Sequence, residues 1–416
     1  MEDWVGAREA SEFLGVKRET LYAYVSRGKL RAAPGSDGRG KVYSRADLER
    51  VRERSQARSG HAPVAASALH WGEPVLDSQI SSFPPGGHHY RGVSAVEQAK
   101  EGFEPTCELL WTGQGADEWP DWPLPEDLGA EPRRVAGLLP KDARPTDVLP
   151  LAIAAMAAAD PLRFAAPPAA DLHRARLILR RMVGWMALPR GLAACLDALR
   201  APRLAVGVVH GLGGAGIDDP TVLYAADLAL VLSADHGLTA STFAARVVAS
   251  TGADLYSSLS AGLGALSGPK HGGISDRVEA LVDEAGKPAR AAAVVHDRLR
   301  RGEAIPGFGH RLYPDGDERT PHLMEVARQL GGGPRLETVF AIARTMEEAG
   351  HEPPSLDFGL VAVAEALGLC RGAAVGIFAV GRAAGWVAHI IEQRESNQLL
   401  RPRARAVDGR APGTSR

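Results

Sequence analysis

The sequence predicts an all-α protein behind a small, charged N-terminal module, and three observations lead to that prediction. From about residue 65 onward, apolar residues recur at helical spacing and convincing strands are few. Alanine and glycine are plentiful while aromatic residues make up 6% of the chain, a composition that favours closely packed helices. With 416 residues, 45% of them hydrophobic, the chain is long enough for two or three domains with a sizeable core.

The charge and cysteine content argue against several classes of protein. A net charge of −2 predicts no general attraction to nucleic acid or membrane. Three widely spaced cysteines give neither a disulfide framework nor a zinc spacing, so we expect no metal site and a reducing cytoplasm. The first residues lack the pattern of a signal peptide. The apolar run Leu149–Ala159 is too short to span a bilayer, and Val375–Ile391 is interrupted by Arg382, so no membrane contact is expected.

Residues 1–58 form a separate module with 13 Lys/Arg against 9 Asp/Glu. The spacing of apolar residues predicts two helices, Ala7–Leu14 and Arg18–Arg27. A turn over residues 35–40 then separates two short strand-like pieces. Residues 59–68 have the composition of a linker, which marks the end of the module.

The module resembles a winged helix-turn-helix of the mercury-regulator and excisionase type. Ser44, with Asp47 three residues on, is a candidate N-cap that opens its last helix, to about Arg54. The resemblance implies that the second helix enters the major groove of DNA. The side chains that would face DNA are Lys17, Arg18, Thr20, Tyr24 and Arg27, with Arg39 and Lys41 in the wing. A small helical appendage with a solvated charged face stays an alternative, because the charge excess of the module is modest.

A glycine-rich stretch, Gly211–Gly216, formally matches a dinucleotide-binding fingerprint. It follows a strand-like run, Leu204–His210, and Asp235 lies about the expected distance beyond it. However, Ile217–Pro220 intervenes where a helix should open, and no further alternation of strands and helices surrounds the motif. We therefore interpret the glycines as an interhelical loop and keep a nicotinamide-dependent oxidoreductase as a distant alternative.

Two short glycine-rich motifs each contain one histidine. The first is Ser-Gly-Pro-Lys-His-Gly-Gly at 267–273, and the second is Pro-Gly-Phe-Gly-His-Arg-Leu-Tyr at 306–313. Glycine removes side-chain bulk and frees the backbone, so a ligand can approach both the imidazole and the adjacent peptide groups. Together with Asp357, His271 and His310 form a candidate catalytic set. On the residues alone, a helix N-cap is the favoured interpretation of Asp357.

Residues 75–405 resemble citrate synthase in many segments that occur in the order typical of that family. The segments include Ala234–Arg246, both histidine motifs, Asp315–Arg319, the Asp357 segment and Gly381–Trp386. The resemblance implies an almost wholly helical citrate synthase fold, an active site between a large and a small domain, and an obligate homodimer.

The resemblance also predicts where the domains begin and end. The large domain would comprise residues 69–271 and 363–405, and the small domain would comprise residues 272–362. The composition of the last residues predicts a disordered tail over 406–416.

The reaction that the resemblance implies removes a proton from the methyl group of acetyl-CoA, and the carbon then attacks the ketone of oxaloacetate. It needs a positioned base and stabilisation of the developing enolate. Asp357 would be the base, His271 would stabilise the enolate, and His310 would donate to the ketone oxygen. The backbone close to CoA would come from Gly307, Phe308 and Gly309.

Oxaloacetate carries two carboxylates, so its site needs several cations, preferably planar arginines. By the resemblance these are Arg319, Arg382 and Arg401, with His236 as a further partner. Arg401 would come from the neighbouring subunit of the dimer. Arg382 also interrupts an apolar helix, so it needs a polar partner in any case.

Three positions, Thr239, Lys270 and Ile274, depart from the common family pattern. They remove no catalytic group, but they put the acyl-CoA preference in doubt. We expect citrate synthesis from acetyl-CoA as co-substrate, oxaloacetate and water, with no tightly bound cofactor. Synthesis of 2-methylcitrate from propionyl-CoA remains open, because one methylene is worth only about 1–3 kcal/mol. A metabolite-sensing DNA-binding regulator is the further alternative.

Overall fold

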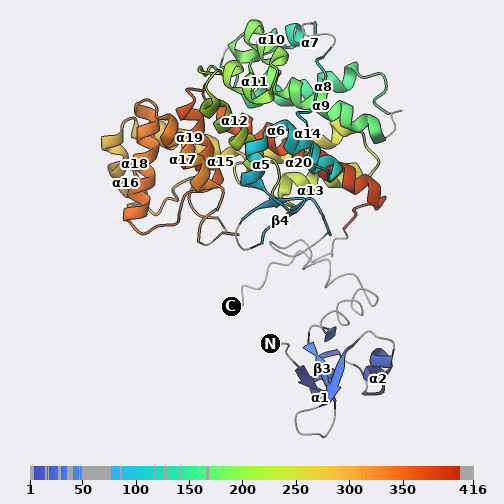
Figure 1. Ribbon diagram of the computed structural model, residues 1–416. Coiled ribbons are helices and arrows are strands. Elements are labelled where there is room, and N and C mark those ends of the chain that lie inside the picture. Colours follow the sequence, from blue (N-terminus) through green and yellow to red (C-terminus); the bar gives the residue numbers. More distant parts are fainter. Residues whose placement is uncertain are drawn as a thin grey trace, which may run out of the picture. The chain divides into compact units, whose positions relative to one another are not determined.

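The chain folds as two compact units, Met1–Asp77 with Arg401–Arg416 and Ser78–Leu400 (Figure 1). The computed structural model describes residues 4–14, 16, 18–26, 30–34, 41–45, 47–48, 76–84, 87–116, 118–125, 130–140, 142–164, 168–310, 312–313 and 315–402. The predicted linker and the predicted disordered tail lie outside the described residues.

The N-terminal unit contains an antiparallel sheet and two helices. The strands β1 (Trp4–Gly6) and β2 (Ala32–Pro34) both pair with the central β3 (Lys41–Ser44). The two predicted helices are present as α1 (Ala7–Leu14) and α2 (Arg18–Ser26). Their apolar faces pack into a small core made of Val5, Ala10, Leu21, Leu30, Tyr43 and Leu48.

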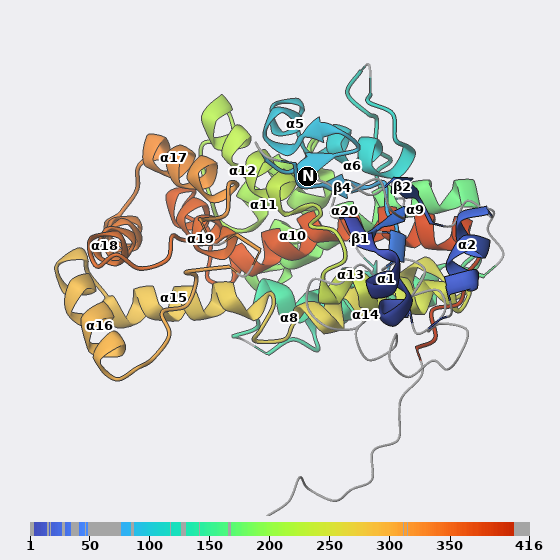
Figure 2. The same ribbon diagram turned by 90° about the horizontal axis from the view of Figure 1, so that it is seen from below.

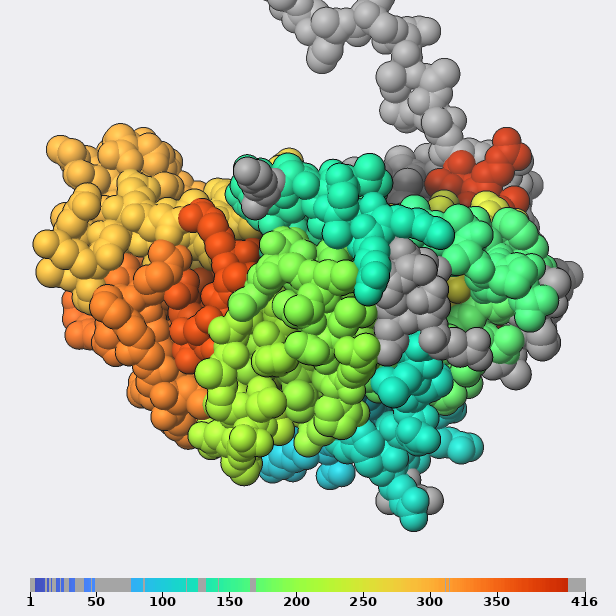
Figure 3. Space-filling model, turned by 90° about the horizontal axis from the view of Figure 1, so that it is seen from above, coloured from blue at the N-terminus to red at the C-terminus, as the bar shows by residue number. Residues whose placement is uncertain are grey.

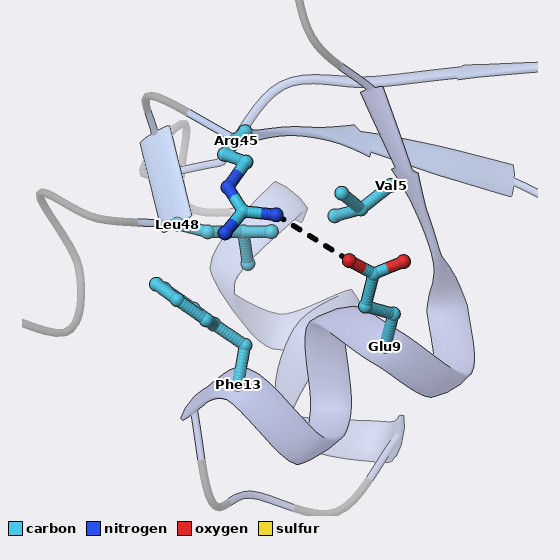
Figure 4. A pocket seen from close by; sticks show the side chains of 5 residues that line it. All are labelled: Val5, Glu9, Phe13, Arg45 and Leu48. Atoms are coloured by element: carbon cyan, nitrogen blue, oxygen red, sulfur yellow. Dashed lines mark hydrogen bonds and ion pairs between the residues drawn. The ribbon is translucent and has the colours of Figure 1, made fainter.

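Polar contacts tie this unit together at the end of β3. Ser44 is the last residue of that strand, Arg45, Asp47 and Leu48 after it are helical, and the N-cap at Ser44 stays a prediction. The carboxylate of Asp47 accepts hydrogen bonds of 2.9 Å from the backbone N–H and the Nε of Arg31. Figure 4 shows the ion pair of 3.4 Å between Arg45 and Glu9, beside a pocket of about 10 Å³ that has room for roughly one water molecule.

The second unit begins with a small sheet and continues as helices. Its sheet has the order β4 (Ser81–Ser82), β5 (His89–Tyr90) and β6 (Val93–Ser94), all antiparallel. The first helices are α5 (Ala95–Glu101), α6 (Phe103–Thr112), α7 (Ala130–Ala136), α8 (Pro145–Ala159), α9 (Pro168–Met186), a 3₁₀ turn at Leu188–Arg190, α10 (Leu192–Arg200), α11 (Leu204–Gly211), α12 (Pro220–Ser233), α13 (Ala240–Ser250) and α14 (Leu255–Leu266). The last are α15 (Gly273–Ala285), α16 (Pro288–Arg300), α17 (Thr320–Leu330), α18 (Pro334–Glu348), α19 (Leu356–Ala366) and α20 (Ala373–Ser396).

Helix α20 is the central element of this unit and runs through the middle of it in Figure 2. It is long and apolar enough to cross a bilayer, but 94% of its most apolar window is buried, against helices that include α12, α13 and α14. Gly385 allows the closest approach, because a Cβ there would lie 2.2 Å from the carbonyl oxygen of Ala234. The backbone after α12 therefore packs directly on α20.

Helices α15 to α19 pack on one another: α16 against α18, α17 against α19, and α15 against α19. In Figure 3 the yellow and orange residues of this group gather at one side of the unit, beside the green α11 and α12. Helix α12 also contacts α17 and α19. Helix α19 continues without a break across residue 362, where the small domain was expected to end.

Two expectations about individual elements were wrong. The spacing of apolar residues over Val93–Leu110 predicts one helix, but the structure divides it at Gly102, whose φ of 102° breaks the helical backbone. The strand-like run Leu204–His210 lies in helix α11, because a short run buried on all sides has the same apolar pattern in a strand and in a helix. The glycines after it form the interhelical loop that we expected, since α12 begins only at Pro220.

Candidate active site

His236 lies just after the end of α12 and is buried, with 7% of its surface exposed. Its Nε2 lies 2.6 Å from the hydroxyl of Tyr313, and its ring meets the ring of His310 edge-on at 5.8 Å between centroids. Burial, followed by the charges of Arg319 and Arg382, holds the pKa of His236 well below its usual range. Burial also lowers the pKa of His310. The second histidine motif thus meets His236, and both rings can donate a hydrogen bond while neutral.

His271 lies between α14 and α15, at the first histidine motif. Its Nε2 is 2.7 Å from the Oγ of Ser241, and Trp386 donates its indole N–H to the same oxygen at 3.2 Å. A Ser241 hydroxyl that donates its proton to Nε2 leaves the Nδ1–H of His271 as a donor. Burial, and then the charge of Arg382, lower the pKa of His271 to about 4. The ring can therefore act as a neutral donor at neutral pH.

Asp357 stands in the first turn of α19 and is half-buried. The N-cap of that helix is Ser355, so Asp357 is not the cap. Its Oδ1 accepts a hydrogen bond of 2.6 Å from the Oγ of Ser275 on α15. Burial raises the pKa of Asp357 to about 6, against the opposing effects of Ser275 and the nearby arginines. A carboxylate with that pKa is suited to accept a proton near neutral pH.

Two buried arginines converge on the end of α12. Arg319 makes two hydrogen bonds to the carboxylate of Asp317, at 2.9 and 2.7 Å, and its Nη1 donates to the carbonyl of Leu232 at 3.2 Å. Arg382 donates from Nε to the carbonyl of Ser233 at 2.8 Å. Both guanidinium groups therefore reach the segment that leads to His236, and their charges act on that ring.

The expected polar partner of Arg382 is present. Its Nη1 lies 3.4 Å from the hydroxyl of Thr239, and its guanidinium stacks over the ring of Phe378 at 4.8 Å from the centroid. Thr239 is one of the positions that depart from the family pattern, and its side chain also accepts from the backbone N–H of Thr242 as the N-cap of α13. The hydroxyl of Thr239 thus caps α13 and also lies within hydrogen-bond distance of Arg382.

The sequence analysis did not identify a buried network of polar contacts around Asp235, next to His236. Asp235 Oδ1 lies 3.1 Å from Nε2 of His389, whose Nδ1 is 2.9 Å from Nη1 of Arg246. Asp235 Oδ2 accepts from the hydroxyl of Ser81 at 2.5 Å and from the N–H of Gly237 at 2.8 Å. The network fixes the backbone on both sides of His236. The sequence offered one indication of this network: His389 is a polar residue two helical turns beyond Arg382 in an otherwise apolar helix.

The segment expected near CoA is held against the one that leads to Asp357. The backbone N–H of Ser355 donates to the carbonyl oxygen of Gly307 at 2.8 Å, and the backbone N–H of Gly309 donates to the carbonyl oxygen of Pro353 at 3.0 Å. Both glycines have positive φ, 82° and 72°, which favours glycine over other residues. The ring of Phe308 lies 4.8 Å from that of Phe358.

Arg401 is exposed and belongs to the first of the two compact units, so its place at the site stays a prediction. Among the described residues, no group of three or more His, Cys, Asp or Glu side chains is arranged to hold a metal ion.

Comparison with known proteins adds two matches to family models. The model for the citrate synthase C-terminal domain matches residues 69–403, and a helix-turn-helix domain model matches residues 4–56.

Citrate synthase 2 of Bacillus subtilis is 41% identical over 189 residues, 44% of this chain and 51% of that protein. The chain thus matches about half the length of that relative. A 2-methylcitrate synthase of Mycobacterium tuberculosis is 34% identical over 331 residues, 75% of this chain and 82% of that protein.

Solved structures agree with the fold. Citrate synthase from Thermotoga maritima superposes with a TM-score of 0.63 at 26% identity and covers 82% of this chain and 96% of its own. The enzyme from Thermoplasma acidophilum, solved as a ternary complex with carboxymethyl coenzyme A and oxaloacetate, gives a TM-score of 0.69 at 24% identity, with the same coverage of both chains. The second likeness concerns the fold alone.

Proposed function

The chain belongs to the citrate synthase family, and from that premise we propose that it condenses acetyl-CoA with oxaloacetate and water to give citrate and CoA. The observation that supports the proposal is a carboxylate of raised pKa and two histidines of lowered pKa, each acted on by the charge of Arg319, Arg382 or both. Asp357 has a pKa of about 6, and the pKa values of His271 and His310 are lowered. Base and donors are therefore in the forms that the reaction needs at neutral pH.

In the proposed mechanism, Asp357 takes a proton from the methyl group of acetyl-CoA. The Nδ1–H of His271 donates to the thioester oxygen, on which negative charge develops. The resulting carbon nucleophile attacks the ketone carbon of oxaloacetate, and a new carbon–carbon bond forms. His310 donates to the ketone oxygen, which becomes the hydroxyl of the product. Water then hydrolyses the thioester and releases CoA.

Charge complementarity supports oxaloacetate as the second substrate. Arg319, which is paired with Asp317, and Arg382 are both buried beside His236, and a carboxylate of the substrate would offset the cost of burying the charge of Arg382. We propose that a homodimer adds Arg401 of the neighbouring subunit to this set. The backbone of Gly307, Phe308 and Gly309 would contact CoA as co-substrate, and no other cofactor is proposed.

Domain closure is part of the proposal. The large domain would comprise residues 69–271 and 363–405, and the small domain would comprise residues 272–362. Asp357 and His310 belong to the latter, and His236 and Arg382 to the former. Bound oxaloacetate would draw the two together and exclude water from the reactive carbon.

A second candidate, 2-methylcitrate synthesis from propionyl-CoA, is favoured by the relative from Mycobacterium tuberculosis. Steady-state assays of oxaloacetate with each acyl-CoA in turn decide between them. We expect the higher kcat/KM with acetyl-CoA. A higher value with propionyl-CoA would assign the chain to the second reaction, and no turnover with either would overturn both.

The N-terminal unit supports a proposal of DNA binding, because it matches a helix-turn-helix model and carries an excess of basic residues. A regulator that senses a metabolite through its synthase domain is the corresponding alternative to an enzyme. We also propose a cytoplasmic location, on the ground that Cys107, Cys195 and Cys370 are all free.

A further inference from the structure

His88 lies immediately before β5, and its hydrogen bonding is unusual for a buried residue. Only 6% of its surface is exposed, yet neither ring nitrogen has a hydrogen-bond partner among the residues that the structure describes. Buried polar groups in proteins are nearly always bonded, because an unpaired one loses its hydration without compensation. The position therefore needs an explanation beyond packing.

The neighbours of His88 account for its carbon atoms but not for its nitrogens. The ring meets His236 edge-on at 5.5 Å between centroids, and it lies 4.8 Å from Tyr90 and 4.7 Å from Phe83. The hydroxyl of Tyr90 is already used, since it donates to the carbonyl of Val231 at 2.6 Å. A leucine could make the same apolar contacts, so the imidazole adds a polar capacity that the fold does not use.

The charges around His88 are those of the substrate site. Arg319, Arg382, Asp235 and Asp317 all act on the ring. Burial, and then Arg319, lower the pKa of His88 to about 3. The ring is therefore neutral, with one N–H donor and one acceptor, and it lies near the two arginines proposed to bind oxaloacetate, of which Arg319 is also paired with Asp317. A neutral donor adds a hydrogen bond there without adding a third buried positive charge.

We propose that His88 is a further substrate-binding residue, whose imidazole N–H donates to a carboxylate of the oxaloacetate bound beside His236. The inference rests on the proposed function and extends it to a residue outside the catalytic set. With His236 and His310 it places three imidazoles around the dicarboxylate.

Three variants of the full-length chain test this role. His88→Leu keeps the apolar bulk and removes both nitrogens. We expect oxaloacetate to bind about tenfold more weakly or worse, with KM raised far more than kcat is lowered. The Tm without substrate should stay equal or rise, because an unpaired polar group leaves the interior. His88→Gln retains an N–H donor, so its affinity for oxaloacetate should lie between those of the unaltered protein and His88→Leu. His89→Asn is the matched control, since His89 is half-buried and its Nδ1 lies 3.0 Å from the carbonyl of Gly87.

Calorimetric titration with oxaloacetate alone separates the outcomes. Unchanged affinity in His88→Leu overturns the proposal, whatever happens to the Tm. If affinity and Tm both fall, a Gln variant that restores affinity supports the proposal and one that does not overturns it. If the unaltered protein fails to bind oxaloacetate, the proposed function falls, and this inference falls with it.

Discussion

The hydroxyl of Ser275 on α15 donates a hydrogen bond of 2.6 Å to the carboxylate of Asp357 on α19. The contact joins the helix that follows the first histidine motif to the helix that carries the proposed base. A hydrogen bond to a carboxylate favours its charged form and so lowers its pKa. The contact partly offsets the effect of burial on Asp357.

The first prediction follows from the sign of that effect. The base acts when it is ionised, so kcat/KM should rise as the pH increases through about 6. Ser275→Ala removes the hydrogen bond and so raises the pKa of Asp357 further. The rise of kcat/KM with pH should therefore occur about one pH unit higher. The measurement is kcat/KM for acetyl-CoA against pH. The control is Ser355→Ala, because the buried hydroxyl of Ser355 has no partner among the described residues. An unmoved limb in Ser275→Ala would contradict the role of this contact.

The second prediction concerns the base itself. Asp357→Asn keeps the shape of the side chain and removes its ability to take a proton. We expect kcat to fall by about 10²- to 10⁴-fold, the usual contribution of a general base. Oxaloacetate affinity, measured by calorimetry, should change little. Near-normal turnover in this variant would show that another group removes the proton.

The third prediction concerns the shared site. If Arg401 acts on the neighbouring subunit, chains carrying Asp357→Asn and chains carrying Arg401→Ala should complement when they are mixed and re-associated. One site of the mixed dimer then has both groups intact, and activity should partly recover. Mixing Asp357→Asn with His310→Asn is the control, since neither site is then complete. No recovery in a verified mixed dimer would assign Arg401 to its own chain.

The fourth prediction concerns the order of binding. Because closure around oxaloacetate should complete the acyl-CoA site, acetyl-CoA should bind about tenfold more tightly or better when oxaloacetate is present. The Asp357→Asn variant allows this to be measured by calorimetry without turnover. Equal affinity in the two titrations would be incompatible with closure driven by oxaloacetate.

The fifth prediction concerns the N-terminal unit. The full-length protein should bind DNA upstream of its own gene, and the affinity should fall steeply with salt. Lys41 is exposed at the start of β3, so Lys41→Ala should reduce the salt dependence by about one phosphate contact. Lys100→Ala, on α5 of the other unit, is the control. Deletion of residues 1–60 should abolish DNA binding and leave synthase activity largely intact.

Absence of DNA binding at low salt, together with loss of activity on deletion, would identify the N-terminal unit as a structural or regulatory appendage.

Local patterns in the sequence predicted much of the fold, and the resemblance to a known family supplied the candidate site. Helix α1 has the bounds that its apolar spacing predicts, because that spacing is a local property. The start of α12 is also set locally, by Asp219, whose carboxylate accepts from the N–H of Thr221. The helical class is confirmed. The convergence of His236 with the second histidine motif agrees with the resemblance, and Asp357 is held within the first turn of its helix.

What the sequence could not predict depends on residues that are distant along the chain. The contact between Asp235 and His389 joins positions more than a hundred residues apart, and no periodicity connects them. The break at Gly102 is equally hidden, because the apolar spacing continues through it. A Cβ at position 102 would lie 2.6 Å from the ring of Trp119, a residue that no helical spacing connects with Gly102. His88 was missed because its significance comes from the arginines that surround it.

The burial of Arg382 affects which substitutions at this position would stabilise the protein. A guanidinium in the middle of a buried helix costs free energy, and an apolar side chain of similar length, as in Arg382→Met, would remove that cost. Selection for heat resistance alone would therefore favour variants that lack the guanidinium proposed to bind oxaloacetate. By that proposal, stability and catalysis make opposite demands on one side chain, so screens for stable variants of this chain need an activity assay as well as a melting curve.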